Sequence, residues 1–597
     1  MQKIFIFILF FIASTSFAQH IISGEVTDAT THQPLIGAIV RVASSSLGAK
    51  TDTAGRYIIK QVTGDSCVLR FTYLGYKPLE ITVGFHELDT AVVSVELEAE
   101  ELEGEEVVIT GTRTLRTIAD VPVRVEAIPI EEVEEKIMMR AANVSMLLSE
   151  TPGLRVQTTS ATSNSSNLRI WGLPGRYTQI LTDGIPNLGG LSSGFSITQF
   201  PPLNIRQVEI IKGASSVLYG ADAIGGVVNF LTKEPRENES FSALVNASTE
   251  GAQDIAAYYT NGTAPEDNES IRGSVFASYN RQALHDVNHD NMSDLAAYDR
   301  INIAPQLALD LSERFQLKVS GGYVYEVRRG GVVDAQDSAI GKAAPYIEKN
   351  TTNRYYYITT ANWRSGEHSA LTVNVGDMSL NREAQYGAVP FDGSQNDFIA
   401  DVQFTLDEPE HSLLFGAGFK SNRFDDKTER TTASLDYSYT IPSLLAQDEW
   451  ALSEQFKILA GVRGDFHSEL GSFVTPRLSF FYKPVPELTM RLSSGTSFKA
   501  PTIFVEEAEE TGYKDIRGFS TLIAERATSV SYDVNWKTLI NNSLGLSINT
   551  ALFMTKLDHA LSVNEDSIDN GIVILENVTG PTISRGLEFT TQLTYSD

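Results

Sequence analysis

The 597-residue sequence contains very few residues that could hold a metal ion or form a covalent cross-link. Cys67 is the single cysteine, which excludes an intrachain disulfide and any zinc site built from several cysteines. The nine histidines form no HExxH motif and no HxxE pair in a suitable setting, so the ligand cluster of a zinc peptidase is missing. We therefore expect no metal site, no cofactor and no enzymatic activity.

Basic residues are also scarce. The chain has 47 Lys and Arg against 75 Asp and Glu, which gives a net charge of −28. Nucleic-acid binding needs a basic surface, so DNA or RNA is not expected among the partners. The acidic excess fits either extracellular loops that attract cations or a plain contribution to solubility.

Long apolar runs are missing beyond the first residues. Ile4 to Ala13 form an apolar run after Lys3, and Ser16–Ala18 supply a small-x-small cleavage signal, so residues 1–18 are predicted to be a secretory signal peptide. No later run is long enough for a membrane-spanning helix. A membrane location would therefore require a closed β-barrel.

Residues 19–98 predict a small β domain. Short runs of strand-forming residues alternate with turn residues, at the spacing of an immunoglobulin-like β-sandwich of about seven strands. The predicted segments are Ile21–Val26, Ala38–Val42, the turn and strand Thr51–Ile59, Val68–Tyr73, Leu79–Val83 and Val92–Leu97.

Residues 99–111 are predicted to connect this domain to the next. Six glutamates fall within residues 98–106, a pattern typical of a solvated linker whose charges repel one another. The segment Glu106–Gly111 that follows is rich in strand-forming residues. It is either the first strand of the next domain or a tethered strand that can leave its domain and add to a partner's sheet edge.

The most specific pattern lies in residues 205–233. Val208 to Ile211 predict a short strand that Lys212 and Gly213 end, and Ala214 to Leu218 have the composition of one helical turn. Gly225 and Gly226 then allow a tight reversal before a second strand, Val227–Thr232. As an isolated pattern this could be a glycine turn between two core strands of any compact α+β module.

The same residues closely resemble the end of the plug domain in TonB-dependent outer-membrane transporters, over nearly thirty consecutive positions. The segments 168–173 and 178–186 also resemble the family's paired motifs around an Arg-Gly and an Asp-Gly, although Trp171 separates Arg169 from Gly172 here. The resemblance implies an α+β plug over residues 112–235. Its motif residues are Arg169, Gly172, Asp183, Gly184, Arg206, Glu209, Lys212, Gly213, Tyr219, Gly220, Gly225, Gly226 and Asn229.

Two further segments gain a meaning from this resemblance. The N-terminal domain resembles the carboxypeptidase-regulatory-like domain, which carries no catalytic residues and often precedes the plug in transporters of the Bacteroidetes type. The strand-prone segment resembles the TonB box in sequence and position, which implies TonB as a partner. The predicted box is Glu106, Val107, Val108, Ile109, Thr110 and Gly111.

Charged plug residues are a further prediction of the resemblance, because plug arginines and acids of this family form ion pairs with the barrel wall. Arg169, Arg206, Glu209 and Lys212 are the candidates here. A buried charge must be paired, since its desolvation otherwise costs several kcal/mol. The alternative, which stays open for Lys212, is that these charges face water.

Residues 236–597 predict a transmembrane antiparallel β-barrel. Long segments alternate between apolar and polar residues, and short turns alternate with long polar loops at 283–300, 332–352, 427–445 and 502–525. The last segment is the clearest, with Leu587, Phe589, Leu593 and Tyr595 on one face and Glu588, Thr590, Gln592 and Thr594 on the other.

The predicted strand count is about sixteen, whereas barrels of this family have twenty-two. A barrel of about sixteen strands has a porin-sized lumen, too narrow for a globular plug. We therefore expect the sequence to be truncated, without about three C-terminal hairpins; a complete smaller barrel is the alternative.

Ligand contacts in this family come from the plug apex and the extracellular loops. The apical segments 157–167 and 187–195 are small, polar and flexible, as a binding surface would be, although ordinary loops look the same. The candidate contacts are Gln157, Asn164, Asn167, Asn187, Gly190, Ser193 and Phe195. His285–Asn291 could suggest a metal site, but a solvated extracellular loop explains it better.

The function implied by the resemblance is active uptake across the outer membrane, energised by TonB and its inner-membrane complex. The plug and the N-terminal domain would lie on the periplasmic side, and outer-membrane lipid would surround the barrel. A ferric siderophore or cobalamin is the expected ligand, with a glycan or peptide as the alternative. A passive porin or adhesin and a secreted β-rich enzyme are the rival classes.

Overall fold

The computed structural model is mostly β-sheet. It describes residues 19–29, 33–42, 47–64, 66–73, 76, 79–85, 90–97, 108–109, 116–117, 121–137, 139, 141–160, 162–186, 190–192, 194–214, 216–263, 269–333, 345–429, 434–541, 544–564 and 572–595. None of the helices in these ranges is long and apolar enough to cross a membrane.

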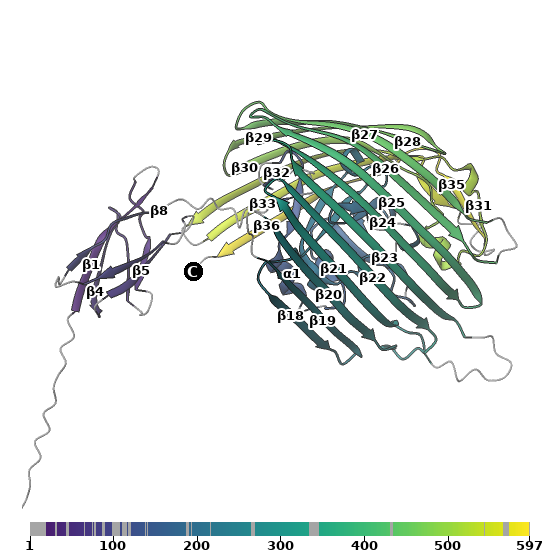
Figure 1. Cartoon of the computed structure of the whole chain (residues 1–597), viewed down its shortest axis with the longest axis horizontal. Helices are drawn as coiled ribbons and strands as arrows, with labels where there is room; N and C mark the ends of the chain where they lie inside the picture. Colours follow the sequence, from purple (N-terminus) through teal and green to yellow (C-terminus); the bar gives the residue numbers. More distant parts are fainter. Residues whose placement is uncertain are drawn as a thin grey trace, which may run out of the picture. The chain divides into compact units, whose positions relative to one another are not determined.

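The N-terminal domain is a β-sandwich, as predicted, but its two four-stranded sheets have eight strands rather than about seven (Figure 1). One sheet has the order β4-β1-β7, with β8 also paired to β1, and the other has the order β3-β2-β5-β6. Ile22, Val40, Leu69 and Phe71 are completely buried between the sheets, because alternate residues of each strand face inward. The strands are β1 (Gln19–Asp28), β2 (Ile39–Val42), β3 (Gly48–Lys50), β4 (Arg56–Thr63), β5 (Ser66–Thr72), β6 (Leu79–Gly84), β7 (Thr90–Val92) and β8 (Val95–Leu97).

The plug is built on a five-stranded sheet of order β11-β16-β17-β14-β15. Two helices and a separate hairpin pack against this sheet around one apolar core, which includes Val133, Leu148, Ile170, Val208 and Phe230. The elements are β11 (Val125–Ile128), α1 (Ile130–Ile137), α2 (Ser145–Ser149), β12 (Leu154–Thr158), β13 (Ser166–Ile170), β14 (Thr178–Thr182), β15 (Ile185–Pro186), β16 (Ile205–Lys212), α3 (Ser216–Tyr219) and β17 (Gly226–Thr232).

The motif stretch forms the centre of the plug sheet. β16 and β17 are antiparallel neighbours, and the short helix α3 lies between them in the chain, so the strand–turn–strand prediction is confirmed. Gly226 has a φ of +148°, and a Cβ there would lie 2.3 Å from the carbonyl oxygen of Ile211. Only glycine permits this close approach of two backbones.

The wall is a sheet of 16 strands in which each strand pairs with the next wall strand along the chain, with β31 omitted between β30 and β32 and β34 and β35 omitted between β33 and β36 (Figure 1). This agrees with the predicted count. The strands are β18 (Ser240–Ala247), β19 (Ala252–Gly262), β20 (Ser270–Gln282), β21 (Ala297–Ser312), β22 (Phe315–Gly331), β23 (Ile347–Arg364), β24 (Ser369–Tyr386), β25 (Val389–Asp407), β26 (His411–Asp426), β27 (Tyr437–Ala451), β28 (Phe456–His467), β29 (Gly471–Val485), β30 (Leu488–Lys499), β32 (Glu525–Asn541), β33 (Leu544–Asp558) and β36 (Thr582–Tyr595).

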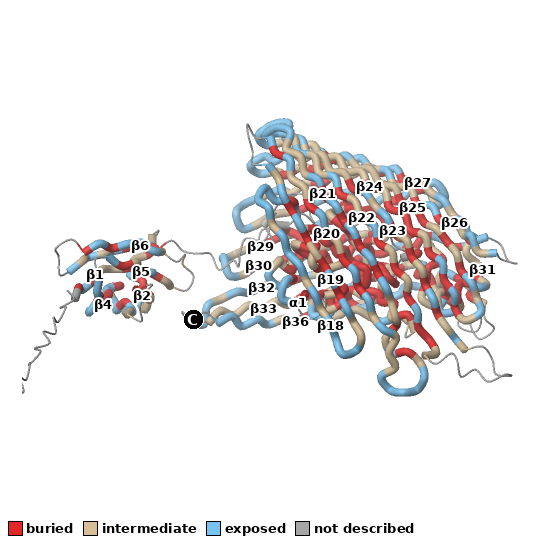
Figure 2. The backbone as a smooth tube through the Cα atoms, turned by 60° about the horizontal axis from the view of Figure 1, so that its bottom comes forward, coloured by how far each residue is buried: buried red, intermediate tan, exposed pale blue. Residues whose placement is uncertain are grey.

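The two faces of this wall differ in polarity. Along β20, Ser274 and Ser278 are buried toward the plug, whereas Ile271, Val275 and Tyr279 are exposed on the outside. Buried positions alternate with less buried ones along parts of other wall strands, such as β19, β21 and β29 (Figure 2). An apolar outer face and a polar inner face are the signature of an outer-membrane barrel.

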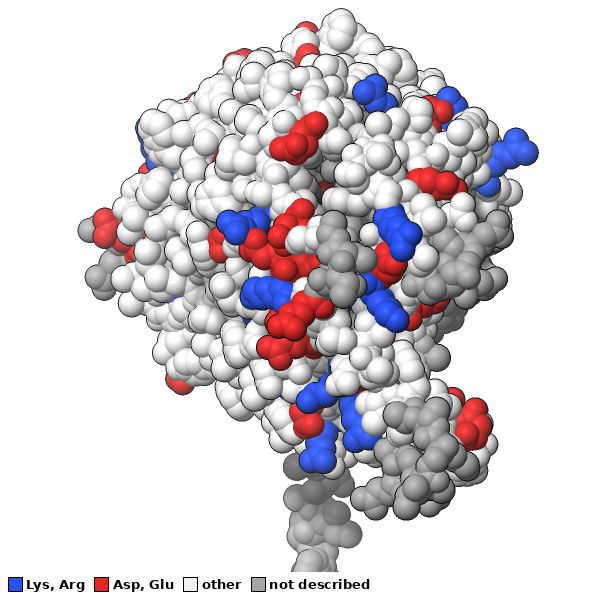
Figure 3. Space-filling model, turned by 90° about the vertical axis from the view of Figure 1, so that its right-hand side faces the viewer, with Lys and Arg blue, Asp and Glu red and all other residues white. Residues whose placement is uncertain are grey.

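The long connections gather at one end of the wall. They include the loop 500–524, which carries the helix α4 (Glu506–Glu510), and a three-stranded sheet that the sequence did not predict. This sheet contains β31 (Ile516–Arg517), β34 (Leu561–Val563) and β35 (Val573–Asn577). Seen from this end, acidic and basic side chains lie side by side around the centre of the face (Figure 3).

Candidate functional site

A polar cavity lies between the apex of the plug and the inner face of the wall. Its volume is about 80 Å³, and two of the predicted ligand contacts, Asn167 and Gly190, line it. The lining also contains aliphatic residues such as Leu168, Ile180 and Ile197. Its charged, amide-bearing and aromatic members include Arg176, Asp222, Gln395, Asp397, Lys420, Asn422, Tyr437, Tyr439, Lys499 and Phe504. A mixture of aromatic surface and a few convergent polar groups is typical of ligand sites.

In this cavity, here called the chamber, the basic side chains form ion pairs with acidic side chains. Asp222, in the turn before β17, accepts hydrogen bonds from Lys499 on β30 at 2.8 Å and Lys420 on β26 at 3.0 Å. Arg176 lies 3.2 Å from the buried carboxylate of Glu525 on β32. The plug and the wall therefore each supply part of a balanced set of charges.

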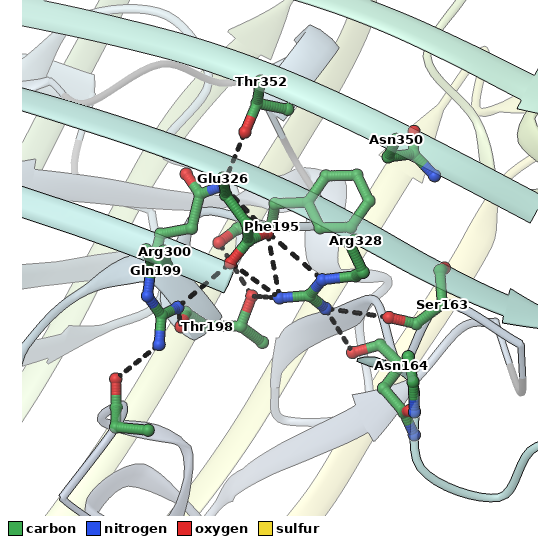
Figure 4. A network of polar contacts seen from close by, with 12 residues as sticks. Ser163, Asn164, Phe195, Thr198, Gln199, Arg300, Glu326, Arg328, Asn350 and Thr352 are labelled. Atoms are coloured by element: carbon green, nitrogen blue, oxygen red, sulfur yellow. Dashed lines mark hydrogen bonds and ion pairs between the residues drawn. The ribbon is translucent and has the colours of Figure 1, made fainter. Parts of the chain in front are cut away.

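On the side of β21 to β23 the plug is held by a buried charge cluster (Figure 4). Glu326 on β22 lies 3.3 Å from Arg300 on β21 and 3.1 Å from Arg328, and all three side chains are at most 3% exposed. Gln199 of the plug donates to Glu326 at 3.3 Å, and Arg328 donates to the carbonyl of Ser163 at 2.8 Å. The charged side chains of the cluster thus find part of their hydrogen-bond partners in the plug, at Gln199 and Ser163.

A second buried cluster joins the plug to β36. Lys212 contacts Glu588 at 3.0 Å and Glu126 at 2.8 Å, and Arg124 contacts Glu588 at 2.5 Å. The indole nitrogen of Trp171 also donates to Glu588, at 3.0 Å. Lys212 therefore does not face water. Trp171, which separates Arg169 from Gly172 in the motif, takes part in the contact with the wall.

The other predicted plug charges lie in different settings. Arg169 is 3.5 Å from Glu506 of the loop 500–524, while Arg206 reaches only the exposed Glu234, at 3.9 Å. Glu209 is completely buried inside the plug, where Gln207 and Asn229 donate to it. A motif residue outside that candidate set also meets the wall: Asp183 accepts from Thr232 and from Lys318 on β22.

The predicted ligand contacts divide into three groups. Asn167 and Gly190 line the chamber. Gln157, Asn164 and Phe195 do not: Gln157 is half-buried on β12, Asn164 bonds to the backbone of Asp294 and Ala296, and Phe195 is 1% exposed. Asn187 and Ser193 lie outside the described residues.

Phe195 has a structural role in this arrangement. Its ring lies 5.0 Å from the guanidinium of Arg328 and 4.7 Å from that of Arg382, so it is enclosed by two cations of the wall. Such cation–π contacts gain strength when water is excluded. The apical loop is therefore fixed to the wall through an aromatic side chain.

The predicted TonB box is described only at its centre. Val108 and Ile109 form β9, which pairs with β10 (Arg116–Thr117) in a two-residue antiparallel ladder. Glu106, Val107, Thr110 and Gly111 lie outside the described residues. Within the described residues this strand pairs with β10, which is compatible with both interpretations of the sequence.

Sequence reasoning did not identify Glu326 or the glutamates of the loop 500–524 as functional. The alternation of residues 587–595 predicts that Glu588 lies on the polar face of its strand, but it does not predict the contact with Lys212 of the plug. Among the described residues no group of three or more His, Cys, Asp or Glu side chains could hold a metal ion. In the loop after β20, Asp286 instead accepts from the backbone of His289 and Asn291.

Known proteins match this chain in all three of its parts. The family model of the TonB-dependent Receptor Plug Domain matches residues 117–227, and the model of the TonB dependent receptor-like beta-barrel matches residues 240–596. The CarboxypepD_reg-like domain model matches residues 22–109.

Two curated relatives come from Vibrio cholerae serotype O1. The Iron-regulated outer membrane virulence protein is 26% identical over 420 residues, which is 67% of this chain and 60% of that relative. The Vitamin B12 transporter BtuB is 22% identical over 505 residues, covering 83% of this chain and 77% of the relative. The chain thus spans only about 60% of the first relative's length.

Solved structures share the fold at low identity. A mutant of the ferric enterobactin receptor PfeA from Pseudomonas aeruginosa aligns with a TM-score of 0.64 and 16% identity, over 81% of this chain and 79% of that one. The siderophore receptor PirA from Acinetobacter baumannii aligns with a TM-score of 0.63 and 16% identity, over 78% and 77%. Because the barrel model alone matches more than half of the 597 residues, the chain belongs to the TonB-dependent receptor family.

Proposed function

We propose that this outer-membrane receptor takes up a scarce small ligand by TonB-dependent active transport, with a ferric siderophore or cobalamin as the ligand. The chain is a receptor and not an enzyme. The observation that carries the proposal is the plug itself, which has a polar chamber at its apex and is tied to the wall by buried ion pairs. A passive pore would need no such obstruction.

The short ladder of β9 and β10 supports the part assigned to TonB. Two residues pair on each side, and a backbone hydrogen bond contributes only about 0.5–1.5 kcal/mol net. A strand whose described pairing is this short can exchange its local partner for the edge of another protein's sheet. Binding of TonB at Glu106–Gly111 would then allow force to reach the plug.

The coupling also has a thermodynamic requirement. Ligand binding promotes release of the box only if the ligand binds more tightly to the state in which the box is free. Asn167 and Asp222 of the plug line the chamber, so a bound ligand would contact the plug directly. The plug follows the predicted TonB box in the chain, and this connection supports coupling between ligand and box.

Deletion of residues 106–111 tests this proposal. Uptake should be abolished, since TonB loses its attachment, while ligand binding to cells should be retained. Deletion of residues 99–104 from the acidic linker removes the same number of residues and is the matched control. Normal uptake without residues 106–111 would refute the TonB-box assignment.

The choice of ligand rests on two relatives, one named as iron-regulated and one as a vitamin B12 transporter. A strain that lacks this gene should fail to grow when the ligand is the single source of iron or vitamin. Growth on single glycan or peptide sources tests the alternative cargo. Uptake that persists without a proton gradient would favour a passive pore instead.

A further inference from the structure

The loop 500–524, here called the lid, covers the chamber. Two lid residues, Thr502 and Phe504, line the cavity. Three further lid residues, Ile503, Ala508 and Tyr513, are buried. The underside packs in one apolar cluster with Leu191 of the plug and with Phe391 and Phe424 of the wall. The lid is therefore a folded part of the site rather than a loose loop.

The helix α4 of the lid carries four glutamates in five residues, and their environments differ. Glu506 and Glu509 are three positions apart and share one face, because residues at this spacing are neighbours on a helix. Glu507 and Glu510 occupy the exposed face and form no ion pair with another described residue. Glu510 is still partly shielded from water, and this desolvation, followed by repulsion from Glu507, Glu506 and Glu509, raises its pKa.

The two inward glutamates hold cations of the plug and the wall. Glu506 accepts from Asn167 at 3.0 Å and lies 3.5 Å from Arg169, both in the plug. Glu509 lies 2.5 Å from Arg382 on β24. The lid thus connects the plug with the opposite wall through two carboxylates.

Arg382 makes the second contact important. Its side chain is 1% exposed, and it stacks on Phe195 and donates to Asn350 at 2.9 Å. A buried guanidinium without a counter-charge is strongly unfavourable, so an anion has to stay near Arg382 as long as water is excluded. Glu509 supplies that anion when the lid is closed.

The chamber is small for the proposed ligands. The cavity holds about 80 Å³, whereas pockets for ligands of drug size measure about 300–1,000 Å³. Entry of a siderophore or cobalamin therefore requires the chamber to widen, and lifting of the lid would widen it and remove both carboxylates from Arg169 and Arg382.

We propose that the lid blocks its own site, with Glu506 and Glu509 occupying the cations that bind negative groups of the ligand. The ligand is then a polyanion that replaces these two carboxylates on Arg169 and Arg382. This inference rests on the proposed function and favours an anionic ferric chelate over cobalamin. It also explains why an acidic helix faces the site.

The lid part is tested without any ligand. A cysteine at Ala508, in a Cys67→Ser background, lies on the buried face of the lid helix α4 and reacts with a membrane-impermeant maleimide only when the lid opens. The double variant E506Q/E509Q should accelerate labelling about tenfold or more, because Arg382 and Arg169 lose their counter-charges in the closed state. E507Q/E510Q changes the same charge on the outer face and should leave the rate unchanged.

If both double variants accelerated labelling equally, or if E506Q/E509Q did not accelerate it, the proposal that Glu506 and Glu509 hold the lid closed would be overturned. Val505→Cys is a second reporter in case Ala508→Cys disturbs the lid. Heat-modifiable migration on a gel confirms that each variant is folded. Deletion of residues 106–111 should not change the labelling rate, so the failure of this test and the failure of TonB-dependent uptake are distinguishable.

The ligand part uses ferric tris(catecholate), a polyanionic chelate, as the probe. It should accelerate labelling of the Ala508→Cys reporter, and Arg169→Gln should reduce that acceleration. Vitamin B12 is the comparison probe and should have no effect. Acceleration by vitamin B12 alone, no acceleration by the chelate, or an effect independent of Arg169 would each overturn the polyanion assignment.

Discussion

The plug meets the wall in two different ways. On the side of β21 to β23, the Glu326 cluster is almost completely buried, with side chains of Glu326, Arg300 and Arg328 at most 3% exposed. At the chamber, the Asp222 contact has side chains that are 24% exposed for Asp222, 21% for Lys420 and 10% for Lys499. The Glu326 cluster excludes water, whereas the Asp222 contact borders cavities.

This difference separates contacts that fix the plug from contacts that can be exchanged. A buried charge that loses its partner has no access to water, so breaking such a pair is expensive. A partly exposed pair is replaced by hydration at small cost. A second cavity of about 50 Å³, lined by Pro186 and Gly220 of the plug and Gly418 of the wall, also borders Lys420. Exchange of partners is therefore easiest on the chamber side.

The largest effect is expected at the buried cluster. Glu326→Gln should lower the stability by about 3–5 kcal/mol, because two buried guanidinium groups are left without a full counter-charge. Thermal unfolding of the purified protein in detergent measures the change. Glu383→Gln removes an exposed glutamate from β24, two strands away in the sheet, and should leave the midpoint unchanged. A small shift for Glu326→Gln would contradict the assigned anchoring role.

A smaller loss is expected at the cluster on β36. Glu588→Gln should cost about 1–3 kcal/mol, since Lys212 and Arg124 both keep Glu126 as a partner. The double variant E126Q/E588Q should lose more than the sum of the single variants, because residues of one network are not independent. Additive losses in the same unfolding measurement would show that the two carboxylates act separately.

The smallest of the three effects is expected at the chamber. Asp222→Asn should cost about 1 kcal/mol or less, because Lys420 and Lys499 reach water when the carboxylate is lost. Asn tolerates the backbone of Asp222, whose φ is +87°, so the substitution tests charge alone. Asp425→Asn breaks an exposed pair with Arg423 and is the control, with no measurable change expected. A loss as large as that of Glu326→Gln would erase the distinction between the two sides.

Local patterns were sufficient for most of the fold. The alternation of β-strands predicted the sixteen-stranded wall, and the glycines between Lys212 and Val227 predicted the strand–turn–strand at the centre of the plug. These features depend on neighbours in the chain, such as the side-chain period of two and the conformations that glycine permits. The face on which Glu588 lies was predictable for the same reason.

Long-range pairing was not predictable. Lys212 and Glu588 are 376 positions apart, and their contact depends on strand register and on the rotation of the plug inside the wall. The burial of Phe195 depends on Arg328 and Arg382 from two different strands. A single sequence contains no measure of these distances.

The sequence by itself therefore determined the order of the three parts and the polarity of each strand, because composition and periodicity are local properties. Only the tertiary structure decided which carboxylates neutralise which cations, and that the glutamates of α4 turn two of their four side chains inward. That decision depends on strands and loops far apart in the chain, which fix their mutual positions only when they pack together.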